Sequence, residues 1–158
     1  MSSPPVEQPS TSAPAPSGSS LALLFRQVRD AMWARMSDEL ARAGHDLSFS
    51  QYIVLKKLAE GAARATDLAR AAELDPGAMS RLLDRLTERG LIARIADPDD
   101  RRALQVALTP EGAASWGDID QCGRRVRERA LSGLSSHEQQ QLTRLLEQVR
   151  NNLSFPDP

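Results

Sequence analysis

The chain has 158 residues, of which 41% are apolar and 26% are charged, a composition typical of a globular domain with a hydrophobic core. Aromatic residues make up only 4%, so the core must consist mainly of Leu, Ala, Ile, Val and Met, which favours helices over strands. The formal net charge is −1, so any nucleic-acid partner would have to be held by a local cluster of arginines.

The sequence argues against several function classes. Its longest apolar run, Leu21–Phe25, is far too short to cross a bilayer, and the N-terminus has no signal-peptide pattern, so we expect a cytoplasmic protein without a membrane partner. Cys122 is the only cysteine, which excludes an intrachain disulfide. Together with His45 and His137 it shows no metal-ligand spacing, so we expect no metal and no cofactor. With no nucleophile–base pair evident, we expect no enzymatic activity.

The N-terminal third begins with a low-complexity segment and continues as helices. Residues 1–19 are rich in Pro and Ser and poor in large apolar side chains, which predicts a disordered tail. From Ser20 apolar residues recur every four positions, which predicts a long amphipathic helix ending near Gly44. These apolar positions are Leu24, Val28, Met32, Met36 and Leu40. Ser48 and Gln51 have capping-box spacing and predict the start of the next helix.

Two helices in the middle of the chain are separated by a short turn. They are predicted over Thr66–Ala72 and Pro76–Arg89, with Asp75 as the N-cap of the second and Pro76 at its first position. The second helix has an apolar stripe consisting of Met79, Leu82, Leu83 and Leu86. A helix, a short turn and a second helix form the helix-turn-helix arrangement, whose second helix enters the DNA major groove.

The outward face of this second helix is suited to DNA. Gly77 permits a close approach, Ser80 can bond a base or a phosphate, and Arg81 and Arg85 can reach guanine or phosphate. The same pattern is compatible with the solvated face of an ordinary bundle helix, since many amphipathic helices expose arginines. This helix alone therefore leaves both interpretations open.

A hairpin is predicted directly after the second helix. The alternation of Leu104–Leu108 predicts its returning strand, and the loop before it has about six residues. A hairpin in this place is a wing whose tip reaches the adjacent minor groove, where Arg101 and Arg102 meet a negative potential. We expect Asp100 to pair with Arg102 or Arg94 and so to aim a guanidinium. A solvated charged turn is the alternative interpretation.

The C-terminal third is predicted to be helical. Thr109 is an N-cap type and Pro110 fits the first helical position, so a long helix begins here. Its glycines, Gly112, Gly117 and Gly123, should each weaken it by about 1 kcal/mol relative to Ala. Ser135 and Glu138 form a second capping box before a last helix. Its apolar face contains Leu142, Leu145, Leu146, Val149 and Leu153. The expected fold is mainly α with a small β-hairpin wing.

The run SRLLDRLTERGLIARIADPDDRRALQVALTPEG, residues 80–112, resembles the signature of the MarR family (multiple antibiotic resistance) of transcriptional regulators. The matching elements are Ser80-Arg81, Leu86 through Arg89-Gly90-Leu91, Arg94, Asp97 with Asp100-Arg101-Arg102, and Leu108-Thr109-Pro110-Glu111-Gly112. The order and length of the helices also agree over roughly residues 21–153.

The resemblance implies a homodimeric winged helix-turn-helix regulator, which we expect to be a repressor that binds a pseudo-palindromic operator in double-stranded DNA. It implies a tail over residues 1–19, a dimerisation helix over 20–47, a DNA-binding lobe over 48–109 and C-terminal dimerisation helices over 110–158. The residues expected to bind DNA are Gly77, Ser80, Arg81, Arg85, Arg94, Arg101 and Arg102. By the family pattern Arg102 is the wing-tip arginine, with Asp100 as its support.

The resemblance also implies an effector, because family members commonly respond to small aromatic, often anionic, molecules. Such a ligand, an aromatic acid for example, would bind between the dimerisation and DNA-binding parts and release the DNA. The candidate pocket residues are Trp33, Met36, His45 and Tyr52, each of which also fits a role in the core or an interface. Two alternatives remain open: a redox-sensing regulator that uses Cys122, and a helical protein-interaction module whose degenerate winged helix no longer binds DNA.

Overall fold

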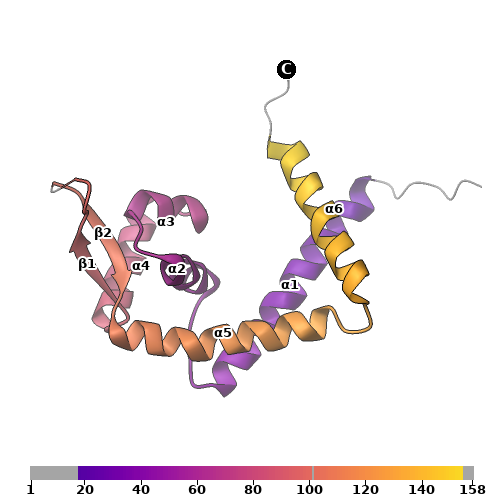
Figure 1. Ribbon diagram of the computed structural model, residues 1–158, viewed down its shortest axis with the longest axis horizontal. Coiled ribbons are helices and arrows are strands. Elements are labelled where there is room, and N and C mark those ends of the chain that lie inside the picture. The colour runs from indigo at the N-terminus through magenta and orange to yellow at the C-terminus, as the bar shows by residue number, and fades with distance from the viewer. Residues whose placement is uncertain (1–17, 101, 155–158) are drawn as a thin grey trace, which may run out of the picture. The chain divides into compact units, whose positions relative to one another are not determined.

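The computed structural model describes residues 18–100 and 102–154. The described chain is mainly helical, with a two-stranded antiparallel hairpin between its fourth and fifth helices, which confirms the expected fold class (Figure 1). Its elements are α1 (Gly18–Arg42), α2 (Phe49–Glu60), α3 (Ala65–Ala71), α4 (Pro76–Glu88), β1 (Ile92–Ala96), β2 (Leu104–Leu108), α5 (Pro110–Ala130) and α6 (Ser136–Ser154). The chain divides into two compact units between Ala31 and Met32, inside α1. The expected tail lies outside the described residues except at Gly18 and Ser19, which begin α1.

The helices begin at the caps that the sequence indicates. Before α2 the hydroxyl of Ser48 accepts from the Gln51 N–H at 3.3 Å, and the Gln51 side chain accepts from the Ser48 N–H at 2.9 Å. The Asp75 carboxylate caps α4, and Ser135 forms the capping box of α6 with Glu138, whose carboxylate accepts from the Ser135 N–H at 2.7 Å. Each cap provides a partner for N–H groups that a helix end leaves unpaired, so these starts are fixed locally.

One apolar core packs the C-terminal end of α1 together with α2 to α5 and the hairpin. The largest fully buried side chains are Val54, Leu55, Leu68, Met79, Leu86, Ile119, Cys122 and Leu40. The apolar stripe of α4 faces this core, so its polar side is held outward. Burial of this stripe orients α4, and Arg81 and Arg85 remain on its exposed side.

The hairpin is connected to the segment before α3 as well as to α4. Its strands pair antiparallel from Ile92 with Leu108 to Ala96 with Leu104, and its loop spans residues 97–103, slightly longer than expected. The sequence does not indicate that the segment before α3 also pairs with β2. Ala63 forms an isolated bridge with Val106, donating to its carbonyl at 3.0 Å and accepting from its N–H at 2.8 Å. A third short segment therefore extends the two-stranded sheet at the middle of β2.

Candidate nucleic-acid interface

Helix α4 presents the predicted DNA-facing residues on one exposed side. The helix buries its apolar stripe, and Gly77, Ser80, Arg81 and Arg85 all lie on the exposed side. The turn before it, residues 72–75, contains Glu73 in the left-handed region with φ of 53°. The turn is closed by the N–H of Leu74, which donates to the Ala69 carbonyl at 2.9 Å. α3, this turn and α4 form the helix-turn-helix arrangement that the sequence predicts.

Arg81 lies beside the N-terminal turn of α4. A methyl group added at Gly77 would lie 3.5 Å from a guanidinium nitrogen of Arg81 and 3.2 Å from the Asp75 carboxylate. The Ala78 N–H, which donates to this carboxylate at 2.8 Å, is the main reason why the pKa of Asp75 is lowered, and the charge of Arg81 adds to the effect. The N-terminal end of α4 thus combines a glycine, an arginine and the positive pole of the helix, which together suit a phosphate or a base edge.

Asp100 does not make the expected ion pair. The prediction is wrong for Arg94, which has another partner, and at Arg102 the bond is to the backbone instead of the guanidinium. Arg94 pairs instead with Asp84 of α4, at 3.1 Å. The Asp100 carboxylate accepts from the backbone N–H of Arg102 at 3.0 Å. An aspartate commonly bonds the N–H two residues on, and this local bond competes with reaching a side chain. Asp100 therefore shapes the loop backbone, while Arg102 is exposed and Arg101 lies outside the described residues.

The wing loop is held by Asp97, which belongs to the family signature, together with Arg64, which no sequence pattern indicates. Asp97, only 2% exposed, accepts on one oxygen from the Arg64 side chain, at 2.9 Å from Nε and 2.7 Å from Nη2. Its other oxygen accepts from the Asp99 N–H at 2.9 Å. The bond from Asp99 and then the Arg64 guanidinium lower the pKa of Asp97, so the buried carboxylate stays ionised.

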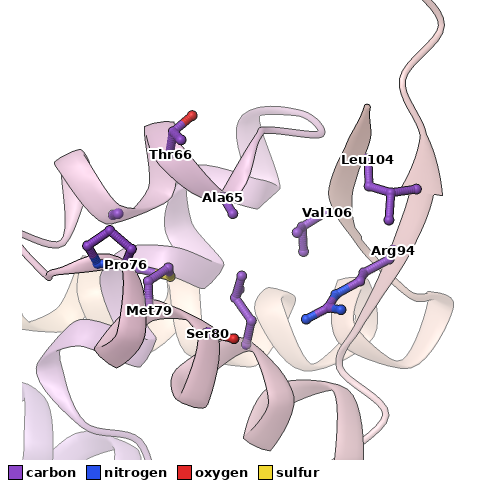
Figure 2. A pocket seen from close by; sticks show the side chains of 10 residues that line it. Ala65, Thr66, Pro76, Met79, Ser80, Arg94, Leu104 and Val106 are labelled. Carbon is purple, nitrogen blue, oxygen red and sulfur yellow. The ribbon is translucent and has the colours of Figure 1, made fainter. Parts of the chain in front are cut away.

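A cavity of about 270 Å³ lies between α3, α4 and the hairpin (Figure 2). Its walls are mainly apolar, and its polar side chains are the hydroxyls of Ser80 and Thr66 and the guanidinium of Arg94. The other lining residues are Ala65, Ala69, Pro76, Met79, Leu83, Leu104 and Val106. Two of the predicted DNA-binding residues, Ser80 and Arg94, therefore also line a hollow large enough for a small ring compound.

The four candidate effector residues do not form one group. Trp33 and Tyr52 have ring centroids 6.1 Å apart and are tilted relative to each other. The aromatic cluster continues to Phe49, edge-on to Trp33 at 5.1 Å, and to Trp116, tilted against Tyr52 at 5.9 Å. Burial is the main cause that raises the pKa of the Tyr52 hydroxyl. Phe49 and Trp116 are not among the predicted pocket residues. Because aromatic residues make up only 4% of the chain, their presence is the signal that could have indicated them.

Met36 joins the aromatic group, whereas His45 faces elsewhere. A methyl group added at Gly123 would lie 3.4 Å from the Tyr52 hydroxyl and 4.0 Å from the Met36 methyl, so both side chains converge on α5 there. His45 Nε2 lies 4.0 Å from an Asp118 carboxylate oxygen and has no hydrogen-bond partner among the described residues. Met36 is buried in the core, which fits its packing role.

Cys122 is placed as a buried structural residue. Its Sγ accepts from the Arg125 side chain at 3.3 Å, and Arg125 also pairs with Glu39 at 2.6 Å. Burial raises the pKa of the Cys122 thiol, and this outweighs the lowering by Arg125. A redox sensor needs an accessible thiolate, so this environment disfavours the redox alternative.

We expect the Cys122 thiol of the native protein to react with a soluble aromatic disulfide on the order of 100-fold more slowly than in the unfolded chain, because reaction requires local opening. The release of thiolate from the reagent, followed with and without denaturant, measures both rates. Equal rates in the two conditions would show that the thiol is accessible and would restore the redox alternative.

Within residues 18–100 and 102–154, no group of three metal-ligating side chains comes together. None of the helices in this part of the chain is long and apolar enough to span a membrane.

Comparison with known proteins identifies the family. The MarR family model matches residues 45–103. MarR of Salmonella typhimurium is 32% identical over 109 residues, which are 66% of this chain and 74% of that protein. The fold is similar to that of an E. coli MarR mutant complexed with operator DNA, with a TM-score of 0.67, 27% identity and coverage of 82% of this chain and 93% of that one. It is also similar to Bordetella bronchiseptica BpsR, whose DNA binding is regulated by 6-hydroxynicotinic acid, with a TM-score of 0.70, 25% identity and coverage of 87% and 98%. The chain belongs to the MarR family of DNA-binding transcriptional regulators, which are not enzymes.

Proposed function

We propose that this protein is a cytoplasmic repressor that binds a pseudo-palindromic operator as a homodimer and is released by an aromatic, anionic effector. The observation that carries the proposal is the single exposed face of α4, with Gly77, Ser80, Arg81 and Arg85, followed directly by a hairpin whose loop exposes Arg102. In this arrangement α4 enters the major groove and the wing loop lies along the adjacent minor groove.

The charge of the chain is compatible with this role. The DNA-binding face concentrates its arginines locally, and a two-fold dimer doubles the set of Arg81, Arg85 and Arg102 along the DNA. The net charge of −1 is a sum over the whole chain, and exposed charges more than about 10 Å from the DNA are largely screened at moderate salt. The affinity should still fall linearly on a log–log plot against salt concentration.

A titration against DNA separates this function from that of a protein-interaction module. We expect the full chain to bind a duplex from upstream of its own gene at least about 1,000-fold more tightly than an unrelated duplex at the same salt concentration. Fluorescence anisotropy of labelled duplexes measures both affinities. Equal, weak binding to the two duplexes would instead favour a helical interaction module with a degenerate winged helix.

The proposal of a homodimer rests on apolar faces that no described residue covers. Of the described residues of α6 none is buried, and Leu142, Leu145, Leu146 and Leu153 are exposed on it. α1 likewise exposes Leu21, Leu24, Phe25, Val28 and Met32. Exposed stripes of this kind mark interaction surfaces, and a second copy of the chain is the occupant that fits the family. We therefore assign residues 20–47 and 110–158 to dimerisation and residues 48–109 to the DNA-binding lobe.

Replacing both Leu145 and Leu146 by Glu is expected to convert the dimer into a monomer, because each change places a charge in an apolar interface. Light scattering coupled to size exclusion should report a mass falling from twice 17.3 kDa to 17.3 kDa. Gln140→Glu adds a charge to the other side of the same helix and serves as the matched control. A wild-type protein that is monomeric at micromolar concentration and still binds its operator tightly would contradict the dimer.

Two places in the described chain suit an aromatic acid. The sequence indicated the Trp33–Tyr52 group, whose rings could stack on a ligand. The cavity beside Arg94 offers apolar walls and a cation for a carboxylate. The regulation of BpsR by 6-hydroxynicotinic acid supports this ligand class. The effector would act by favouring a lobe spacing that no longer matches the DNA grooves, which is a difference in affinity between two states.

We expect at least one member of a panel of aromatic acids to raise the melting temperature, since a ligand at 100 times its Kd stabilises the native state by about 2.7 kcal/mol. Differential scanning fluorimetry on wild type, Trp33→Leu and Arg94→Gln locates the site, because the shift is lost in the variant whose replaced side chain binds the acid. Lys57→Gln, which removes a cation elsewhere, is the control. No shift with any acid would rule out this effector class.

A further inference from the structure

The residue at the N-cap of helix α3 is an arginine, although a side chain that accepts hydrogen bonds is favoured at this position. Arg64 is the N-cap residue of α3, and within the described part of the chain its side chain makes no cap hydrogen bond. Ser, Thr, Asp and Asn are the favoured residues at such a position because they accept from the first N–H groups. α3 has only seven residues and would gain from a cap. The Arg64 side chain instead binds a carboxylate of the wing loop.

The Arg64 guanidinium reaches across to the wing. Both Nε and Nη2 donate to one oxygen of Asp97, at 2.9 and 2.7 Å, while half of the Arg64 side chain remains exposed. Asp97 is the first residue after β1 and is the only charged residue among the buried side chains of the described chain. Through its second oxygen it also receives the Asp99 N–H, so the same carboxylate holds the direction in which the loop leaves β1.

The neighbouring residue provides a second link to the wing. Ala63 makes two backbone hydrogen bonds with Val106 in the middle of β2. This bridge fixes the middle of the hairpin, whereas the loop that begins at residue 97 is linked to the start of α3 only by the Arg64–Asp97 pair among the hydrogen bonds and ion pairs of the described residues. The two links start from adjacent residues, so together they hold both the hairpin strands and the loop against the helix-turn-helix.

We propose that Arg64 and Asp97 are positioning residues that hold the wing loop at the angle at which Arg102 enters the minor groove. The proposal rests on the DNA-binding function proposed above. Arg64 itself need not touch DNA, since its guanidinium is engaged with a buried carboxylate. The pair acts on affinity through the preorganisation of the loop, because a loop that must be ordered on binding lowers the affinity.

A double-mutant cycle on operator binding tests this coupling. The full-length proteins are wild type, Arg64→Gln, Arg102→Ala and the combination, each measured by fluorescence anisotropy at one salt concentration. We expect Arg102→Ala to weaken binding about tenfold in wild type but less than about twofold in the Arg64→Gln background, since residues that act through one another are not additive. Arg64→Lys keeps one charged hydrogen bond to Asp97. In this background Arg102→Ala should therefore weaken operator binding by more than in the Arg64→Gln background and by less than in wild type.

Two controls separate a positioning role from general destabilisation. Arg70→Gln breaks an ion pair with Asp67 that stays within α3, at 3.3 Å, and should leave the cost of Arg102→Ala unchanged. The cost of Arg81→Ala should also be the same with and without Arg64→Gln, because Arg81 contacts DNA from α4. If Arg64→Gln does not fold, as judged by circular dichroism, the same cycle is run with Arg64→Lys, whose expected coupling is smaller but of the same sign.

Additive costs of the Arg64 and Arg102 substitutions would overturn the proposal. A loss of about one unit in the salt slope on Arg64→Gln, together with additivity, would show instead that Arg64 binds a phosphate directly. Failure of the DNA-binding function is a separate result, since neither Arg81→Ala nor Arg102→Ala would then weaken binding to the operator.

Discussion

Replacing Gly112 by alanine is expected to lower the free energy of unfolding by about 3 kcal/mol or more, which is the upper end for overpacking. A Cβ atom at this position would lie 1.9 Å from the Leu91 carbonyl oxygen and 2.8 Å from its carbon. These are backbone atoms that cannot rotate away, so the first turn of α5 would have to move from the start of β1. A loss of this size is a large fraction of the roughly 5–15 kcal/mol that stabilises a typical domain.

A network of hydrogen bonds around Gly112 would be disturbed by such a movement. The Thr109 N–H donates to the same Leu91 carbonyl at 3.1 Å, and the Gly112 N–H donates to the Thr109 hydroxyl at 3.0 Å. The Thr109 hydroxyl in turn donates to the Gly90 carbonyl. This small network joins the end of α4, the wing and the start of α5, so displacing Gly112 breaks several bonds together.

Urea denaturation followed by circular dichroism measures this change, and the chain contains a matched control. Gly117 lies further along α5 with no described atom within 4 Å of an added methyl group. Gly117→Ala should therefore stabilise the protein by about 0.5–1 kcal/mol, as expected for a glycine in an exposed helix interior. Equal stability of Gly112→Ala and wild type would show that the close approach at Leu91 is not maintained.

The second large effect concerns the DNA-binding arginines. We expect Arg81→Ala to weaken operator binding by about 1–3 kcal/mol, a factor of about 5 to 150, and to relax the preference at one base position if Arg81 bonds guanine. Arg102→Ala should weaken binding to single-base operator variants to a similar extent, because the minor groove presents a degenerate pattern, and should reduce the salt slope by about one unit, because one cation near the phosphates is lost. The two substitutions therefore differ in their effects on base preference and on the salt dependence of binding.

Titrations at several salt concentrations, on the operator and on single-base variants of it, measure both signatures. Arg124→Ala removes an exposed arginine that pairs with Asp120 on α5 and should leave the affinity within about twofold of wild type, since surface ion pairs contribute little. Unchanged operator affinity for both Arg81→Ala and Arg102→Ala at moderate salt would show that the DNA-binding surface lies elsewhere.

Features that depend on neighbouring residues could be predicted from the sequence. The Ser48–Gln51 capping box, the Asp75 cap and the exposed face of α4 are confirmed, because caps and apolar periodicity are encoded within one or two helical turns. Helix boundaries deviate by a residue or two, as at α3, which begins at Ala65 where Thr66 was expected. The order of helices and hairpin follows from these local signals and from the resemblance.

Features that depend on distant residues could not be predicted. Arg64 and Asp97 are 33 positions apart, and neither the bridge of Ala63 to β2 nor the cavity beside Arg94 has a local pattern. Gly112 was expected only to weaken a helix, yet its lack of a side chain is what permits the approach of Leu91. Charge patterning predicts a guanidinium partner for Asp100, whereas its carboxylate accepts from the backbone N–H two residues on.

The aromatic cluster also depends on distant residues. Trp33 and Tyr52 lie near each other, as their positions in the sequence predict, but Trp116, 64 residues after Tyr52, completes the cluster. The exposed leucines of α6 form an apolar surface that a second copy of the chain would cover in the proposed dimer.

Selection of the full-length protein against a pool of random duplexes tests whether it binds DNA as a two-fold dimer. We expect enrichment of one pseudo-palindromic sequence with half-site centres about one helical turn, roughly 10–10.5 base pairs, apart, because a two-fold dimer presents two copies of α4. The protein with Arg81→Ala should enrich a sequence with weaker preference within each half-site. A pool that stays random, or a single unrepeated site, would contradict a dimeric operator-binding regulator.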